Sequence, residues 1–410
     1  MPKIITSVNW SAQNVPSGLS FDPQTGSFSG TPVGTGEYTI PVTVQTNYGR
    51  DTKDVILDVV HTYPVYVIGT QAETWSEGAE ADEYGFRKLN MPKATNIIPI
   101  YKGFCARTDA KKAFFCSTAP MPKQTEVGSL HESDIIVCNT PTEMLFDEIV
   151  DMSACLLRPQ DGSIHYITYC VSFLCRDNVL YVYRIKITQE TQLPSSDSML
   201  IRYENVIKSQ DMYGQGLAFI WDIDNNNMHT PLSTHAIIMN EDIVPKIKKI
   251  AGYSTNSGVD TDTFYWLTTD GVFNYENSLI GNVQISELGK IKDFWLNPFA
   301  IYSSFFLLNE DNILYAKGSN VAHRLGLTEN NVNYSTPTEV GIFDVKTINV
   351  PFLLTRDGKL YHTGTANGIN IAGNPHTSFT HIFPNYRFHD IAYSHEAGTL
   401  AVLLKNTMED

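Results

Sequence analysis

A degenerate repeat in the second half of the chain limits its fold more than any other feature. Residues 313–318 have the sequence Ile-Leu-Tyr-Ala-Lys-Gly, and residues 359–364 have the sequence Lys-Leu-Tyr-His-Thr-Gly. In both copies an apolar segment and an acidic turn precede the Leu-Tyr pair, and a polar loop follows the glycine. Such a repeat indicates an architecture in which similar units pack side by side.

Each copy has the order of parts of a β-hairpin: an apolar strand, a tight acidic turn and a second strand. The same turn occurs in seven copies along the chain. The turn residues are Asp109, Asp161-Gly162, Asp224, Asp270-Gly271, Asp311, Asp357-Gly358 and Glu396-Ala397-Gly398. Their average spacing is roughly 48 residues, the length of a four-stranded propeller blade and not of a helical repeat. The sequence therefore predicts a seven-bladed β-propeller.

A short segment before each turn alternates apolar and polar residues. The clearest segments are 96–100, 247–251, 291–294, 345–348 and 389–392. A period of two residues is typical of a strand with one buried face. We therefore expect each copy to consist of strands throughout.

The two ends of the repeat array are complementary. The last copy ends after the apolar segment 400–404 and has no Leu-Tyr strand, while an isolated strand, 65–69, precedes the first copy. The simplest arrangement is that residues 66–69 complete the final blade. Ring closure of this kind removes two open sheet edges that would otherwise promote aggregation.

Three segments that follow the fifth turn, at Asp311, resemble a known family. They are Leu-Tyr-Ala-Lys-Gly-Ser-Asn at 314–320, Leu-Gly-Leu at 325–327 and Ser-Thr-Pro-Thr-Glu-Val at 335–340. In this order they are similar to the repeats of the regulator of chromosome condensation, a family of β-propellers, over about one and a half repeats. Gly318 and Gly364 are matched elsewhere only by Gly69, at the predicted ring closure. The repeated Trp-Asp ending of one other propeller class and the paired-glycine motif of the kelch class are absent.

Residues 1–62 follow a different pattern, in which Gly and Pro separate short segments of strand-forming residues. This pattern predicts a β-sandwich, with the propeller occupying residues 63–410. The stretch from Gly18 to Pro32 resembles immunoglobulin-like modules related to the cadherin-like domain of dystroglycan. The resemblance implies a spacer or adhesive unit of a large surface or virion protein.

Composition limits the classes of partner. The chain has 44 acidic and 29 basic residues and a net charge of −15, whereas nucleic-acid binding needs clustered Lys and Arg. No segment has the length and apolar character of a membrane-spanning helix, and the N-terminal residues lack the apolar run of a signal peptide. We therefore expect no nucleic-acid partner, no membrane insertion and synthesis in a cytoplasm.

Six cysteines lie in the first half of the predicted ring, and none has Cys-x-x-Cys spacing. They are Cys105, Cys116, Cys138, Cys155, Cys170 and Cys175. Their apolar, strand-like surroundings favour buried thiols over disulfides or a metal site, although the state of the six stays open. Four isolated histidines have no zinc-ligand spacing. They are His229, His235, His323 and His362.

One acidic loop could begin a calcium site, because residues 222–227, Asp-Ile-Asp-Asn-Asn-Asn, place oxygen side chains at alternate positions. The glycine and the later glutamate of such loops are absent, so a blade turn is the favoured interpretation, as it is for 260–262. Calcium binding at 222–227 stays open. We predict no catalytic residue, no metal ligand and no cofactor, because nucleophile elbows, phosphate-binding glycine loops and His-Glu-x-x-His pairs are missing.

These features favour a non-enzymatic structural protein of a bacteriophage virion, such as a tail, fibre or head-decoration subunit. We expect its partners to be other virion proteins in a symmetric assembly and a glycan or protein of the host surface, since exposed aromatic residues suit such surfaces. A bacterial cell-surface adhesin is the main alternative. An intracellular scaffold or exchange factor is the third, and an enzyme in a propeller funnel is a residual possibility.

Overall fold

The structure is a computed structural model. It describes residues 6–123, 126–146, 148–157, 166–188, 198–204, 206–210, 219–222, 227–229, 236–238, 246–253, 263–277, 281–297 and 304–407. The chain separates into two compact units, Met1–Thr62 and Tyr63–Asp410. The predicted fold class, all-β with a sandwich followed by a propeller, is confirmed.

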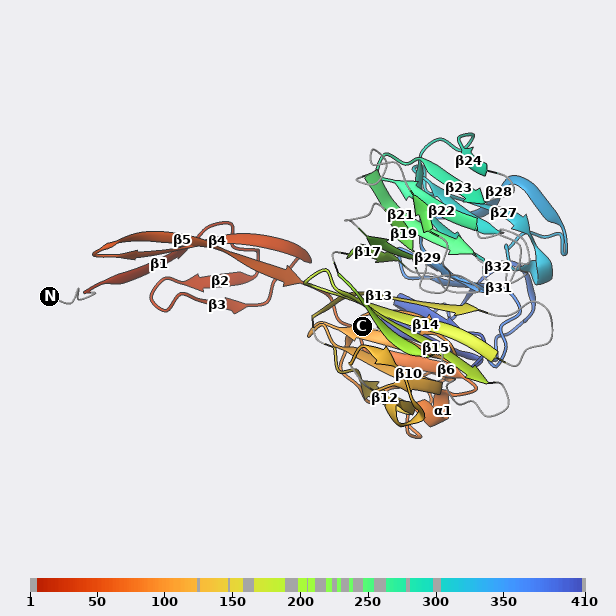
Figure 1. Cartoon of the computed structure of the whole chain (residues 1–410), viewed down its shortest axis with the longest axis horizontal. Coiled ribbons are helices and arrows are strands. Elements are labelled where there is room, and N and C mark those ends of the chain that lie inside the picture. Colours follow the sequence, from red (N-terminus) through yellow and green to blue (C-terminus); the bar gives the residue numbers. More distant parts are fainter. Residues whose placement is uncertain are drawn as a thin grey trace. The chain divides into compact units, whose positions relative to one another are not determined.

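The first unit is a small β-sandwich of two sheets (Figure 1). One sheet has the order β1-β4-β5, and the other pairs β2 with β3. The strands are β1 (Val8–Ala12), β2 (Leu19–Asp22), β3 (Ser27–Gly30), β4 (Gly36–Thr46) and β5 (Gly49–Val59). The sheets touch where the Trp10 ring of β1 lies against Gly26, between β2 and β3. A Cβ atom at Gly26 would lie only 2.9 Å from that ring.

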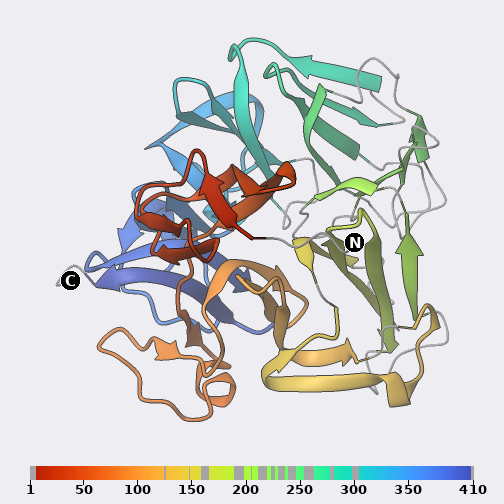
Figure 2. The ribbon, with the colours of Figure 1, turned by 90° about the vertical axis from the view of Figure 1, so that its left-hand side faces the viewer.

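In the second unit the described residues form seven sheets, which follow one another around a ring in chain order (Figure 2). We number these blades 1 to 7. Blade 1 consists of β8 (Ala94–Ile100), β9 (Gly103–Thr108), β10 (Ala113–Pro122) and β12 (Ile135–Glu143). Blade 2 consists of β13 (Ile149–Leu157), β14 (Tyr166–Cys175), β15 (Leu180–Thr188), β16 (Met199–Tyr203) and β11 (Gly128–Ser129). Blade 3 consists of β17 (Val206–Gln210), β18 (Phe219–Asp222), β19 (Asn227–His229) and β20 (Ala236–Ile238).

Blades 4 to 7 have four strands each. Blade 4 consists of β21 (Ile247–Tyr253), β22 (Thr263–Thr268), β23 (Phe273–Asn277) and β24 (Gly281–Ile285), and blade 5 of β25 (Ile291–Leu296), β26 (Phe305–Asn309), β27 (Ile313–Ser319) and β28 (Asn333–Phe343). Blade 6 consists of β29 (Val345–Asn349), β30 (Phe352–Thr355), β31 (Leu360–Gly364) and β32 (His376–Ile382). Blade 7 consists of β33 (Tyr386–Ser394), β34 (Thr399–Thr407), β6 (Val65–Gly69) and β7 (Arg87–Lys88). The short helices are α1 (Ala72–Trp75), η1 (Glu132–Asp134) and η3 (Val321–His323).

Apolar side chains fill the space between neighbouring blades. Between blades 4 and 5, for example, the Tyr265 ring packs against Phe305 and the Phe273 ring against Phe294, with centroid distances of 5.6 and 5.0 Å. All four rings are buried. Because each sheet buries one face against each neighbour, a single blade would expose its core, and the ring is the unit of stability.

Blade 7 joins the two ends of the ring. Strand β6, from the start of the unit, pairs antiparallel with β34 from its end, with Ile68 opposite Leu400 and Val67 opposite Ala401. The predicted closure by residues 66–69 is therefore confirmed. The pairing covers both sheet edges that a linear array of repeats would expose.

Glycine is the last or the last but one residue of the third strand in blades 5 to 7, at Gly318, Gly364 and Gly69. All three have positive φ angles, of 107°, 65° and 122°. At Gly69 a Cβ atom would also lie 2.2 Å from the carbonyl oxygen of Gly398. Both the backbone conformation and the close approach therefore require glycine there.

We expect Gly69→Ala to lower the free energy of unfolding by about 2 kcal/mol, because it combines backbone strain with a steric clash at the ring closure. Gly128→Ala is the matched control, since Gly128 has a φ of 140° but open space around a Cβ atom. The control should cost about 1 kcal/mol, from strain alone. Denaturant unfolding measures both values, and equal losses would contradict the steric part of this account.

The predicted acidic turns are only partly in equivalent places. Asp109, Asp270, Asp311 and Asp357 follow the second strand of blades 1, 4, 5 and 6. Placing Glu396-Ala397-Gly398 in the same series is wrong, since it joins the first two strands of blade 7. In blade 7 the second and third strands are β34 and β6, which come from opposite ends of the unit, so the two chain ends lie where the other blades have this turn. The turn after the second strand of blade 2 contains Asp177 and Asn178, whereas Asp161-Gly162 and Asp224 lie outside the described residues.

The strict alternation predicted for the first strand of each blade is wrong near its start. In six blades one extra residue is inserted into the pairing with the second strand. The inserted residues are Thr95, Val150, Lys248, Lys292, Lys346 and His389. A β-bulge of this kind moves the following residues to the opposite face of the strand, so buried residues recur at a spacing of three, as in Ile291 and Phe294.

Candidate functional site

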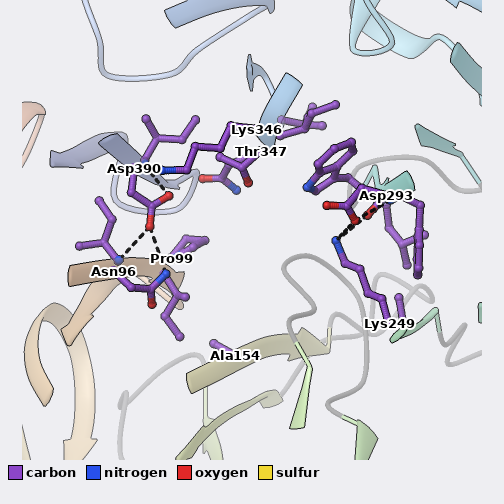
Figure 3. A pocket seen from close by; sticks show the side chains of 18 residues that line it. Asn96, Pro99, Ala154, Lys249, Asp293, Lys346, Thr347 and Asp390 are labelled. Carbon is purple, nitrogen blue, oxygen red and sulfur yellow. Dashed lines mark hydrogen bonds and ion pairs between the residues drawn. The ribbon is translucent and has the colours of Figure 1, made fainter. Parts of the chain in front are cut away.

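A cavity of about 280 Å³ lies among the first strands of the blades, toward the axis of the ring (Figure 3). Residues of β8, β13, β21, β25, β29 and β33 line it. Its charged side chains are Lys249, Asp293, Lys346 and Asp390. Figure 3 shows Lys346 and Asp390 on one side of the cavity and Lys249 with Asp293 on the other.

The bulges explain why polar side chains line this cavity near the axis of the ring. Five polar residues directly follow the inserted residue of their strand and line the cavity. They are Asn96, Lys249, Asp293, Thr347 and Asp390. Without the extra residue, the pleat would turn these side chains to the other face of the blade. One local distortion, repeated around the ring, therefore makes the cavity polar.

The Lys249 ammonium connects blades 4 and 5. Its Nζ donates to Asp293 Oδ1 at 2.8 Å and to the carbonyl oxygen of Phe294 at 2.7 Å. It also lies 5.1 Å from the ring centroid of Trp295, within the range of a cation–π contact. Asp293 Oδ1 accepts a further hydrogen bond, from the backbone N–H of Phe294 at 2.8 Å.

The Asp390 carboxylate connects blades 7 and 1. Its Oδ2 accepts from the backbone N–H of Ile97 and from Asn96 Nδ2, both at 3.1 Å, and its Oδ1 accepts from the N–H of Ile391 at 3.0 Å. Burial raises the pKa of Asp390 to about 6, against these hydrogen bonds and the Lys346 charge, which favour its ionised form.

Lys346 Nζ lies across the junction of blades 6 and 7, where it donates to the carbonyl oxygen of His389. Burial lowers the pKa of Lys346, and the nearby Asp390 carboxylate opposes this shift. Arg107 makes a comparable bond from blade 1 to the Val150 carbonyl oxygen of blade 2. Polar contacts near the axis thus tie adjacent blades together.

A second polar cluster lies in blade 6. His362 Nδ1 and His376 Nδ1 are 2.9 Å apart, and His376 Nε2 lies 2.9 Å from the carbonyl oxygen of Ala372. His362 is completely buried, and its Nε2 has no hydrogen-bond partner among the described residues. Across the described ranges no group of three or more His, Cys, Asp or Glu side chains is placed to hold a metal ion.

No catalytic, cofactor or metal residue was predicted from the sequence, and the four charged residues of the cavity were missed as a group. The signal that could have found them is the spacing of apolar residues at i and i+3 in the first strands, as in Ile247 and Ile250. Residues 223–226 of the loop considered for calcium, and 260–262, lie outside the described residues.

The cysteine side chains that the structure describes are buried. Cys105, Cys116 and Cys138 are buried thiols outside any disulfide, Cys170 and Cys175 are buried as well, and the Cys155 side chain is not described. Burial raises the thiol pKa of Cys105, Cys116 and Cys138. Reactive thiolate is therefore scarce at neutral pH.

We expect Cys105, Cys116 and Cys138 to escape alkylation by iodoacetamide in the native protein and to react fully in denaturant, because both access and thiolate formation require unfolding. Peptide mapping by mass spectrometry measures each site. Ser133→Cys supplies an exposed thiol as a positive control. Rapid native labelling of any of the three would contradict their burial.

Comparisons with known proteins agree with this architecture. A family model described as "Putative Ig domain" matches residues 3–60, which is the sandwich alone. Comparison with curated protein sequences finds no match. Human WBSCR16 is similar at 12% identity and a TM-score of 0.54, over 84% of this chain and 100% of its own. Yeast RCC1 (Prp20), solved with Kap60, is similar at 10% identity and a TM-score of 0.54, over 85% and 90%.

Identities this low show a shared fold alone. The described residues of the second unit form a β-propeller. The resemblance to the regulator of chromosome condensation is therefore supported as a similarity of fold. Among the described residues, no helix has the length and apolar character needed to span a membrane.

Proposed function

We propose that this chain is a non-enzymatic structural protein of a bacteriophage virion, in which the sandwich docks on a neighbouring subunit and the propeller is displayed for binding to the host surface. The observation on which the proposal rests most is the apolar surface of the sandwich. Of the twelve large apolar side chains that the described residues expose, six belong to this small unit. They are Val8, Val33, Tyr48, Val55, Ile56 and Val60.

These exposed side chains support docking in an assembly. Val55 and Ile56 are neighbours on β5 and point to opposite faces of its sheet, with Ile56 56% exposed. A module that exposes apolar residues on both faces gains stability by covering them with a partner. The match of residues 3–60 to an Ig-type family supports the same role, since such modules commonly serve as spacers and contacts.

The contacts inside the cavity support a non-enzymatic role. The carboxylates of Asp293 and Asp390 and the ammonium of Lys249 are engaged in bonds that join neighbouring blades. A general acid or base needs a titratable group that can reach a substrate proton. Groups held by hydrogen bonds to the neighbouring blade stabilise the ring instead.

The buried thiols support assembly in a cytoplasm and count against the alternative of an exported adhesin. Cys105 and Cys138 lie in the same sheet as Cys116, and Cys138 pairs with Ser117, the next residue after Cys116. In an oxidising compartment, neighbouring thiols of a folding chain would form disulfides. In a reducing cytoplasm they remain thiols and fill the core.

Electron microscopy of whole phage particles from the source, labelled with an antibody against residues 70–410, tests the proposal. Gold label at a regular tail, fibre or capsid position is the expected result. Label on bacterial envelopes with none on particles would overturn it and favour the adhesin. Binding of the purified chain to host cells, compared with cells stripped of surface glycan, then tests the display of the propeller.

A further inference from the structure

We propose that two copies of this chain pair through strand β5 of the sandwich, edge to edge and antiparallel, about a two-fold axis at Leu57. This inference names the neighbouring subunit as a second copy, so it deepens the docking role of the sandwich and rests on that part of the proposed function. The evidence is an open strand edge, an apolar face of β5 that the second sheet leaves uncovered, and the match of that face with itself.

Strand β5 has an open edge along its 11 residues. It pairs with β4 on one side, and the described residues supply no strand on the other. The carbonyl oxygen of Pro41 in β4 accepts from the N–H of Gln13, on the side away from β5, so Pro41 and its partner Asp54 are a pair without mutual hydrogen bonds. Because an antiparallel ladder alternates, Asp54 and Ile56 direct their backbone N–H and C=O groups to the open edge.

The core-facing side of β5 is apolar in the second half of the strand and poorly covered. Val55 lies opposite the buried Ile40, so it belongs to the core-facing side. Leu57 and Val59 share that side, because side chains alternate along a strand. Val55 is nevertheless 39% exposed, and the other two are only partly buried. The second sheet touches the first at Trp10 of β1, which is the opposite edge strand, so the core at β5 is incomplete.

A second copy supplies a strand that matches this edge. Two β5 strands related by a two-fold axis run antiparallel, with odd-numbered residues opposite odd-numbered residues. With the axis at Leu57, Leu57 lies opposite Leu57 of the second copy and Val55 lies opposite Val59, so the apolar side of each strand covers that of the other. Both open edges are satisfied at once, and no further copy adds at β5.

Other parts of the long strand edges carry features that oppose such pairing. Among the described outer strands of the blades, the two longest, β12 and β28, each contain a proline, Pro141 and Pro337, which cannot donate to a ladder. In the first half of β5, Asp51 and Lys53 place charges on the core-facing side, which also discourages edge pairing. From Val55 to Val59 that side carries no charge, and this is the part that the two-fold pairing uses.

Sedimentation velocity of the full chain tests the inference. We expect a dimer that dissociates on dilution. Val55→Lys places a charge in the shared apolar surface and should weaken the dimer at least tenfold. Thr39→Lys is the matched control and should leave the dimer unchanged, because Thr39 is exposed on β4 opposite Ile56, on the other face of the sheet and away from the open edge.

Cysteine cross-linking tests the register. Since the even-numbered residues of β5 bond across the open edge, Leu57 would face its own copy in a pair without hydrogen bonds, with Cα atoms about 4.5 Å apart, which suits a disulfide. Leu57→Cys should therefore give a disulfide-linked dimer under mild oxidation. Asp51→Cys, on the same face of the same strand but far from the axis, should not.

A wild type that stays monomeric at concentrations up to about 100 µM would overturn the inference. A dimer that Val55→Lys leaves intact, or equal cross-linking of the two cysteine variants, would also overturn it. Particle labelling is independent of these outcomes. A monomer in solution together with label on particles would overturn this inference alone, and a dimer without label on particles would overturn the virion assignment alone.

Discussion

Replacing Val67 with aspartate is expected to lower the free energy of unfolding by about 4 kcal/mol or more, which would leave much of the protein unfolded or aggregated. Val67 is 0% exposed and is the middle residue of the closing strand β6, where it pairs with Ala401 of β34. An aspartate there must either bury a charge without a partner or bind a proton. Either cost opposes the pairing that closes the ring.

The matched control is Val137→Asp, the same chemical change in the outermost strand of blade 1. Val137 is 47% exposed, so its aspartate would stay in water and should change stability by less than about 0.5 kcal/mol. Guanidinium unfolding followed by tryptophan fluorescence measures both variants, and size-exclusion chromatography reports open or aggregated rings. Stability equal to wild type in Val67→Asp would mean that β6 is dispensable for the propeller.

The second large effect is a loss of stability in acid caused by His362. The carbonyl oxygen of Ala372 only accepts, so His376 Nε2 donates to it, and in neutral His376 the Nδ1 atom is then an acceptor. His362 Nδ1 must therefore donate to His376, which leaves His362 Nε2 as a buried acceptor without a partner among the residues that the structure describes. A proton on that nitrogen would find no acceptor.

Burial, with a smaller effect of His376, lowers the pKa of His362 to about 3 from the ordinary 6.5. The unfolded chain binds this proton more readily than the folded one. The contribution of His362 to the free energy of unfolding is therefore fully present above pH 6.5 and is lost as the pH drops toward 3. At pH 4.5 the loss from this one group is about 2.5 kcal/mol relative to pH 7. Asp390 has the opposite slope, since its raised pKa favours the folded state below about pH 6.

The comparison of variants therefore isolates the histidine. In His362→Phe the aromatic ring remains next to Phe352, but the titrating group is gone, so the difference in stability between variant and wild type should change by about 2.5 kcal/mol from pH 7 to pH 4.5. Urea unfolding at several pH values measures this, and parallel curves for wild type and His362→Phe would contradict the assigned shift.

Much of the architecture was predictable because it depends on patterns within short segments. The repeated Leu-Tyr strands, the acidic turns at Asp270, Asp311 and Asp357 and the unpaired segment 65–69 were sufficient to predict seven blades and the strand that closes them. The Gly and Pro spacing before residue 62 was sufficient to predict the sandwich. These signals are local, since a hairpin turn or an alternating strand is encoded by adjacent residues.

The cavity could not be predicted in the same way. Lys249 and Asp293, or Asn96 and Asp390, meet only because the ring places the first strands of neighbouring blades side by side, and the last pair is joined only by closure. The bulges add a second condition, since one extra residue per strand decides which side chain faces the axis. Alternation alone does not show where the extra residue lies, and the turn at Glu396 was misplaced because the strand order of blade 7 was not known.

The sequence by itself determined the all-β class, the two units and the number of blades, because strand, turn and glycine preferences act over a few residues. The tertiary structure decided which charged groups share the axial cavity. It also decided that His362 Nε2 is buried with no hydrogen-bond partner in the described part of the chain. Burial and hydrogen bonding at those sites depend on residues up to about three hundred positions apart in the chain, and no local pattern encodes such distances.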